Sequence, residues 1–306
     1  MERLLAYFQG AKVCGQNRKL GIETETLFVD VRYQPISYLI SQGMMQHLRD
    51  VLDWQVAAQK NGVIVRLEKA GFAISYELGW NNFELTTPAY DLAEDVFREH
   101  DQMLKELYQA GEDYAAQPLA ESAQGSWDHH FSDTLMIPDQ RDKIWLKLDG
   151  EALFGLGHIA AVHFNLDLKS IPEGMAWIRK LNHFFVEAGW PPPYNLLVWR
   201  KYIQESLVGY DEKRYGPAPD DFGEYCHTLS SFAVVMERQG KDLHIANPPL
   251  PFYRRQNPDI DLFLRSVWWY PRLRVRNGNL VLEIRDVPRG IEPRESFRMI
   301  REVLAF

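Results

Sequence analysis

Apolar and polar residues alternate cleanly over 161–168, which is the pattern of a strand with one buried face. His163 and Asn165 fall on the polar side of this pattern. Residues 280–286 alternate in the same way, and Leu20–Val29 is rich in Ile, Thr, Phe and Val. We therefore predict a strand over each of these three segments.

Three other segments carry apolar residues at helical spacing. The first follows Asp91 and Glu94, which form a candidate capping box. The second follows Ser170 and ends near Gly189, and the third starts near Pro293. Strands separated by long helices, without a regular βαβ order, favour an α+β fold with a largely antiparallel sheet.

The composition is that of a globular protein, with 46% hydrophobic and 25% charged residues. Asp and Glu outnumber Lys and Arg by 42 to 34, and the resulting charge of −8 argues against general binding to nucleic acids. Cys14 and Cys226 form no C-x-x-C pair, as suits a reducing compartment. No signal-peptide pattern is present, and the longest stretch without Asp, Glu, Lys or Arg, 152–166, is too short to span a bilayer. We expect a cytoplasmic protein that binds no membrane.

Three short motifs suggest other functions. Residues 155–160 match the dinucleotide fingerprint G-x-G-x-x-A, but a strand is predicted to follow where the fingerprint needs a helix. The sequence D-H-H at 128–130 could hold a metal ion, although a polar loop is the better interpretation. The sequence W-W-Y at 268–270 could stack on a ring, although such clusters more often pack in cores or interfaces.

A pair of carboxylates gives the strongest local signal. Glu23 and Glu25 lie two residues apart within Leu20–Val29, so they project from the same face of the strand, about 7 Å apart. They repel each other unless a positive charge lies beside them. Hard cations such as Mg²⁺ take oxygen ligands, so the two carboxylates are candidate ligands for a metal ion at this strand. The alternative is an exposed edge strand with a polar face.

A second acidic pair favours the metal interpretation. Residues 74–77 and 83–86 flank a turn-like insert, and a hairpin between them brings Glu77 and Glu84 close together. One face of the sheet would then gather carboxylates, a histidine and an arginine, while helices pack on the other face. The members of this polar face are Glu23, Glu25, Glu77, Glu84, His163, Glu283 and Arg285.

Phosphoryl transfer with several Mg²⁺ ions uses such a face, because carboxylates hold the metals that bridge phosphate oxygens. An arginine on the same face can clamp a phosphate or a substrate carboxylate through paired hydrogen bonds. The residues by themselves therefore predict a divalent-metal enzyme that uses a nucleotide, with its active site on the carboxylate-lined face.

Six segments, in order, resemble those of the glutamate–cysteine ligase superfamily, in particular the plant-type carboxylate–amine ligases. The match spans roughly residues 20 to 290. The segments are G-I-E-T-E at 21–25, I-S-Y-E-L-G at 74–79 with F-E-L-T at 83–86, A-V-H-F-N-L-D at 161–167, W-R at 199–200 with D-E-K-R-Y-G at 211–216, the helix-like 222–238, and W-Y-P-R-L-R at 269–274 with L-E-I-R-D at 282–286.

The resemblance implies a catalytic fold of the glutamine synthetase and guanido kinase type. It implies that ATP phosphorylates a carboxylate, typically the γ-carboxylate of glutamate, and that an amine such as that of cysteine attacks the acyl phosphate, as in glutathione biosynthesis. Arg285 and Glu25 would be catalytic, and Arg200, Arg214 and Arg285 would bind the substrate. The implied ligands of Mg²⁺ or Mn²⁺ are Glu23, Glu25, Glu77, Glu84, His163 and Glu283. Because motifs from both ends of the chain contribute to one site, we expect residues 1–306 to form a single catalytic domain.

The chain departs from the family pattern in places that concern the acceptor. The family's Gly-Gly-Gln is replaced at 79–82 by G-W-N-N, and the usual P-K-x-R-Y appears at 138–142 only as P-D-Q-R-D. The identity of the amine substrate therefore stays open, and so does the oligomeric state. The alternatives are the same chemistry with another amine or acid, a phosphagen-kinase-like transfer to a guanidino group, and a non-catalytic nucleotide-binding descendant.

Overall fold

The computed structural model describes residues 1–91, 93–120, 140–187 and 193–306. Among them is a nine-stranded sheet with the order β12-β13-β7-β1-β5-β4-β3-β2, in which β6 also pairs with β1. Every neighbouring pair in this sheet is antiparallel. Its strands are β1 (Leu20–Val29), β2 (Gln55–Lys60), β3 (Val63–Lys69), β4 (Phe72–Tyr76), β5 (Asn82–Thr86), β6 (Gln117–Pro118), β7 (Ala161–Asp167), β12 (Pro271–Arg276) and β13 (Asn279–Pro288).

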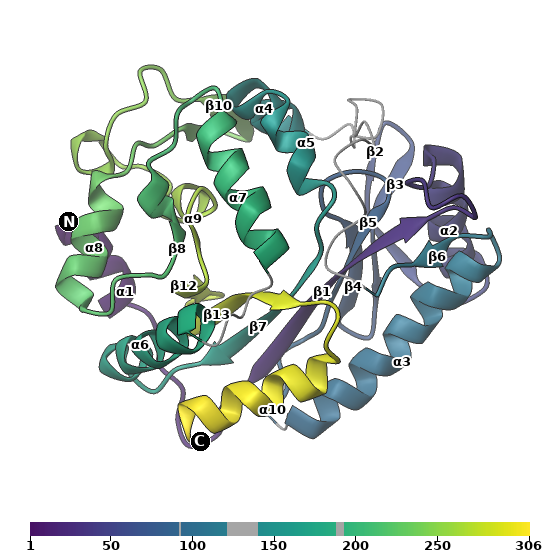
Figure 1. Ribbon diagram of the computed structural model, residues 1–306, viewed down its shortest axis with the longest axis horizontal. Coiled ribbons are helices and arrows are strands. Elements are labelled where there is room, and N and C mark those ends of the chain that lie inside the picture. Colours follow the sequence, from purple (N-terminus) through teal and green to yellow (C-terminus); the bar gives the residue numbers. More distant parts are fainter. Residues whose placement is uncertain (92, 121–139, 188–192) are drawn as a thin grey trace.

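Long helices cover the apolar face of the sheet (Figure 1). Two hydrophobic cores lie between these helices and the strands; Ile22 and Phe164 belong to one core, and Leu67 and Leu85 to the other. The helices packed on this side are α2 (Tyr38–Asp50), α3 (Ala93–Glu112), α6 (Ile171–Glu187) and α10 (Pro293–Leu304).

A third hydrophobic core lies over part of the polar face and includes Ile144, Leu153, Tyr202 and Trp268. It is built largely by α4 (Gln140–Asp149), α5 (Ala152–Leu156) and α7 (Pro193–Glu205). The remaining elements are α1 (Glu2–Gln9), β8 (Tyr215–Gly216), α8 (Phe222–Ser231), β9 (Met236–Gln239), β10 (Asp242–Ile245), α9 (Ile260–Leu264), β11 (Trp268–Trp269) and two short 3₁₀ turns, Glu212–Arg214 and Phe252–Arg254.

The predicted α+β fold with a large antiparallel sheet is confirmed. The strand Leu20–Val29 has the predicted bounds, and the strand predicted over 161–168 ends one residue earlier. The Ser170 hydroxyl accepts a hydrogen bond from the backbone N–H of Glu173 at 3.2 Å, in the first turn of α6. The predicted end of that helix at Gly189 lies outside the described residues.

The three competing motifs have different outcomes. Gly155 lies inside the short helix α5, and the strand β7 follows, so the nucleotide fingerprint is not realised. The D-H-H motif at 128–130 lies outside the described residues. Trp268, Trp269 and Tyr270 are buried and pack against other rings. None of the described helices combines the length and the apolar run needed to cross a bilayer.

Candidate active site

Strand register sets the floor of the candidate site. On β1, Glu25 lies opposite Glu84 of β5, and Glu23 lies opposite His163 of β7. On the other side of β7, Glu283 of β13 lies opposite Asn165. Because residues opposite each other in antiparallel strands share a face, the floor gathers these side chains on one face of four strands.

A pocket of about 560 Å³ lies over this floor, within the size range of small-molecule sites. Among its described lining residues, six are acidic and six are arginines, and the two kinds of charge occupy different parts of the pocket. Carboxylates occupy the middle of the floor, and most of the arginines come from β12, β13 and the segment after α9. Such a lining can receive an anionic ligand beside a cation, despite the negative charge of the whole chain.

Three carboxylates meet at the centre of the pocket. One oxygen from each of Glu25, Glu77 and Glu84 lies within 4.8 Å of the others. The predicted hairpin explains this meeting, since the backbone N–H of Glu77 donates to the carbonyl of Asn82 at 3.1 Å where the hairpin turns. Gly79 occupies the turn with φ of 92°, a conformation that favours glycine. The predicted proximity of Glu77 and Glu84 is therefore confirmed.

Burial and repulsion from neighbouring carboxylates disfavour the ionisation of Glu25 and Glu84. Burial and the charges of Glu77 and Glu23 raise the pKa of Glu84 well above its usual value. Burial, followed by the charge of Glu77, raises the pKa of Glu25 to about 7, against the opposing effects of His163 and of a hydrogen bond from the Ala161 N–H. These three half-buried carboxylates form a hard-oxygen donor set that fits a divalent cation such as Mg²⁺.

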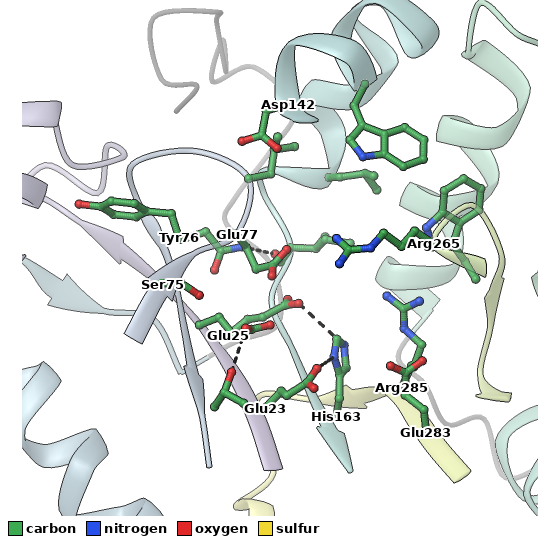
Figure 2. Close-up of a pocket in the computed structure, with 18 of the residues that line it drawn as sticks. Glu23, Glu25, Ser75, Tyr76, Glu77, Asp142, His163, Arg265, Glu283 and Arg285 are labelled. Carbon is green, nitrogen blue, oxygen red and sulfur yellow. Dashed lines mark hydrogen bonds and ion pairs between the residues drawn. The ribbon is translucent and has the colours of Figure 1, made fainter. Parts of the chain in front are cut away.

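His163 links the two carboxylates of β1, as Figure 2 shows. Its Nδ1 lies 3.3 Å from an oxygen of Glu23, and its Nε2 lies 3.8 Å from an oxygen of Glu25. Burial alone would raise the pKa of Glu23, but the hydrogen bond from His163 and the charge of Arg276 outweigh it, so this pKa is lowered. Asn165 also donates to Glu23, at 3.1 Å. Glu23 is thus an ionised group with several donors around it.

Glu283 lies among arginines rather than with the trio. Its two oxygens form ion pairs with Arg272 and with Arg276, the latter at 2.7 Å. Burial opposes its ionisation, but the charges of Arg272 and Arg274 hold the pKa of Glu283 well below its usual value. The metal-ligand role implied for Glu283 would therefore compete with two existing ion pairs.

Arg285, on the same strand, lines the pocket and directs its guanidinium into it (Figure 2). The other two arginines proposed for the substrate do not line it. Arg200 is an exposed residue of α7. Arg214 is 1% exposed, and its guanidinium donates hydrogen bonds to the carbonyls of Ser266 and Ala233. These bonds give Arg214 a structural role in the interior.

The sequence interpretation missed the arginines of β12. Arg272, Arg274 and Arg276 alternate with Leu273 and Val275, and all three line the pocket. The same period-two argument that paired Glu23 with Glu25 would have placed them on one face. The pairing with β13 then sets Arg272 opposite Glu283, and Arg276 also forms an ion pair with Glu283.

The comparisons with known proteins give structural neighbours only. No protein-family model and no curated protein matches the chain. A glutamate–cysteine ligase from Francisella tularensis, solved with AMP, superposes with a TM-score of 0.44 and 13% sequence identity over 96% of this chain and 66% of that one. A bifunctional glutathione synthetase from Pasteurella multocida gives 0.43 and 13% over 99% of this chain and 39% of that one. The chain thus spans less than two thirds of either neighbour.

Proposed function

We propose that this protein is an ATP- and Mg²⁺-dependent ligase that joins a carboxylate to an amine through an acyl phosphate, with the γ-carboxylate of glutamate as the first candidate acid. One observation carries the proposal: the half-buried trio of Glu25, Glu77 and Glu84 lies in the same pocket as a set of arginines. The ordered motifs that resemble the glutamate–cysteine ligase superfamily support it, and we infer one catalytic domain from their spread along the chain.

Glu25, Glu77 and Glu84 would hold a divalent cation, and Glu23 with His163 would hold a second one. When bound, such cations would neutralise phosphate charge and offset the repulsion between ATP and an anionic acceptor. Without a cation, Glu25 would be partly protonated at neutral pH, because its pKa is raised to about 7. Metal binding would therefore release protons.

The arginines of the pocket would bind the phosphates of ATP. Arg285 points into the pocket from β13, and Arg274 and Arg276 line the same pocket from β12. A preorganised guanidinium stabilises charge as it develops on a transferring phosphoryl group. Glu283 fixes Arg272 and Arg276 by ion pairs, which keeps this cationic wall in place.

The reaction balances as follows. An oxygen of the substrate carboxylate attacks the γ-phosphorus of ATP, and ADP leaves. The neutral amine then attacks the acyl carbon, phosphate leaves, and the nitrogen gives up one proton. Hydroxylamine can replace the amine and trap the acyl phosphate as a hydroxamate, because it is a small neutral nucleophile.

An assay of ADP release with glutamate, Mg²⁺ and a panel of amines tests the proposal, and hydroxylamine provides the acceptor-independent arm. We expect ADP only when both acid and nucleophile are present. Glu25→Gln should abolish it, whereas the control Glu302→Gln, at an exposed position on α10, should not. Folded, Mg²⁺-loaded protein that releases no ADP with any acid and nucleophile would refute the ligase function. ADP release with a guanidino acceptor and no amide product would select the phosphagen-kinase alternative.

A further inference from the structure

The cationic wall of the pocket carries more positive charge than the carboxylates paired with it. Its four arginines, from β12 and β13, are Arg272, Arg274, Arg276 and Arg285. Glu283 forms ion pairs with Arg272 and Arg276, and Arg276 forms another with Glu23. Two carboxylates therefore face four guanidinium groups. Within the described part of the chain, Arg274 and Arg285 are the two members of the wall without an ion pair.

Arg274 is the more deeply buried of these two arginines. It is only 6% exposed, and its Nε is enclosed without a hydrogen-bond partner. Its guanidinium forms no hydrogen bond with the residues that the structure describes. The nearby Glu283 cannot offset this charge alone, because both of its oxygens are held by other arginines. A buried charge without a partner is costly, so an anionic ligand at Arg274 would be strongly favoured.

Strand register places Arg274 and Arg285 on opposite sides of Glu283. Arg274 lies opposite Val281, two residues before Glu283 on β13, and Arg285 follows two residues after it. Positions two residues apart on a strand share a face and are separated by about 7 Å. The wall therefore offers two separate guanidinium groups, one on each side of the same ion-paired carboxylate.

The trio of Glu25, Glu77 and Glu84 marks which side is the reacting one. Beyond Arg285, β13 continues to Pro288, which lies opposite Ala161 of β7. The backbone N–H of Ala161 donates to Glu25 at 2.9 Å. Arg285 is thus on the side of the candidate metal ligands and directs its guanidinium into the pocket (Figure 2). Arg274 lies on the far side of Glu283, away from the group that reacts.

The burial of Arg274 limits the size of the group that it can bind. A terminal carboxylate is small and accepts two parallel hydrogen bonds from one guanidinium. The phosphates of ATP continue into a ribose and a base, which need a more open part of the pocket. The edge at Arg66, whose side chain is 41% exposed, is such a part. A carboxylate is therefore the better ligand for Arg274.

We propose that Arg274 binds the second carboxylate of a dicarboxylic acid substrate, the one that is not phosphorylated, and so selects dicarboxylic over monocarboxylic acids. This inference rests on the ligase function proposed above and names the residue that recognises its acid. Among the arginines of the pocket, Arg274 would thus bind the acid rather than ATP. It would take the role that the sequence interpretation gave to Arg200 and Arg214, neither of which lines the pocket.

Glutamate and 4-aminobutyrate test this proposal, because they differ only by the carboxylate that is not phosphorylated. With ATP, Mg²⁺ and hydroxylamine, we expect kcat/KM for hydroxamate formation to be at least about 100-fold higher for glutamate. Arg274→Gln should bring this ratio close to one through a loss of activity on glutamate, without a change in the KM for ATP. Arg98→Gln, on α3 with a side chain that is 67% exposed, is the matched control and should keep the ratio.

Arg274→Lys keeps the proposal testable if the glutamine variant does not fold. It retains the charge but loses the paired donors, so it should lower the ratio without abolishing the preference. Equal use of both acids by the wild-type protein would overturn the proposal, and so would a ratio that neither variant changes. A raised KM for ATP with an unchanged ratio would also overturn it, because Arg274 would then bind a phosphate.

Failure of the ligase function itself has a different signature, which is the absence of hydroxamate from the wild-type protein with either acid. In that case calorimetric binding of glutamate and 4-aminobutyrate to the protein with Mg²⁺ decides. Tighter binding of glutamate, lost in Arg274→Gln, would retain the carboxylate site. Equal binding of both compounds would overturn it.

Discussion

Replacing Glu25 by Gln should stabilise the metal-free protein at neutral and alkaline pH. Burial and the charge of Glu77 raise the pKa of Glu25 from 4.5 to about 7 in the folded state. The native protein therefore binds more protons than the unfolded chain between these two values, and its stability falls as the pH rises through that window. The difference corresponds to about 3 kcal/mol above pH 7.

Glutamine removes this cost with little change in shape. Its carbonyl can still accept the hydrogen bond from the Ala161 N–H, which is 2.9 Å long in the native site. The free energy of unfolding in EDTA should rise by up to about 3 kcal/mol at pH 8, and the gain should vanish below pH 4.5, where Glu25 is protonated in both states.

Magnesium should cancel most of the difference between the two proteins. Mg²⁺ at 100 times its Kd stabilises a protein that binds it only in the native state by about 2.7 kcal/mol. The wild-type protein has all three carboxylates and should gain this amount, while Glu25→Gln should gain much less.

Urea denaturation followed by circular dichroism measures both effects, in EDTA and in Mg²⁺, at pH 4.5, 6 and 8. Glu302→Gln changes a side chain that is 64% exposed and should follow the wild-type protein throughout. The reasoning fails if Glu25→Gln is the less stable protein in EDTA at pH 8. It also fails if Mg²⁺ stabilises the wild-type protein and this variant equally.

Three further predictions concern neighbouring groups. Burial raises the pKa of Asp149 to about 6, so ionisation of this carboxyl destabilises the fold above that pH. Asp149→Asn, whose side chain still accepts a hydrogen bond from Tyr202, should raise the free energy of unfolding by up to about 3 kcal/mol at pH 7 and by nothing below pH 3.8. A pH-independent effect would contradict this prediction. Arg272→Met leaves Glu283 without a buried partner and should lower the free energy of unfolding, measured by urea denaturation, by about 3–5 kcal/mol. The double variant Arg272→Met with Glu283→Leu should recover much of this loss. A small loss in the single variant would count against the importance of this ion pair. Arg285→Ala should lower the rate of ADP release about 100- to 1000-fold without shifting the unfolding midpoint, and a near-normal rate would remove Arg285 from the chemistry.

The row of carboxylates could be predicted because it depends on local periodicity. In a strand, side chains two residues apart share a face, so Glu23 and Glu25 had to project together, and the turn at Gly79 had to bring Glu77 back toward Glu84. The same rule holds for Arg272, Arg274 and Arg276, whose signal is present in the sequence although the interpretation passed over it.

Contacts between distant segments followed no such rule. Arg214 carries the same charge as Arg285, and no local pattern indicates that its guanidinium turns inward to the carbonyls of Ser266 and Ala233. Asp142 and Trp145 sit on a helix with little apolar periodicity, and only its packing over the sheet places them above the trio.

The sequence by itself determined which face of each strand is polar, because the period of two is a property of the extended backbone. Only the tertiary structure decided which polar groups meet. The register between β12 and β13 sets Arg272 against Glu283, and the hairpin joins Glu77 and Glu84 to Glu25. Such meetings depend on strand order and on helix packing, which the whole chain fixes by burying its apolar surfaces, and no short segment encodes them.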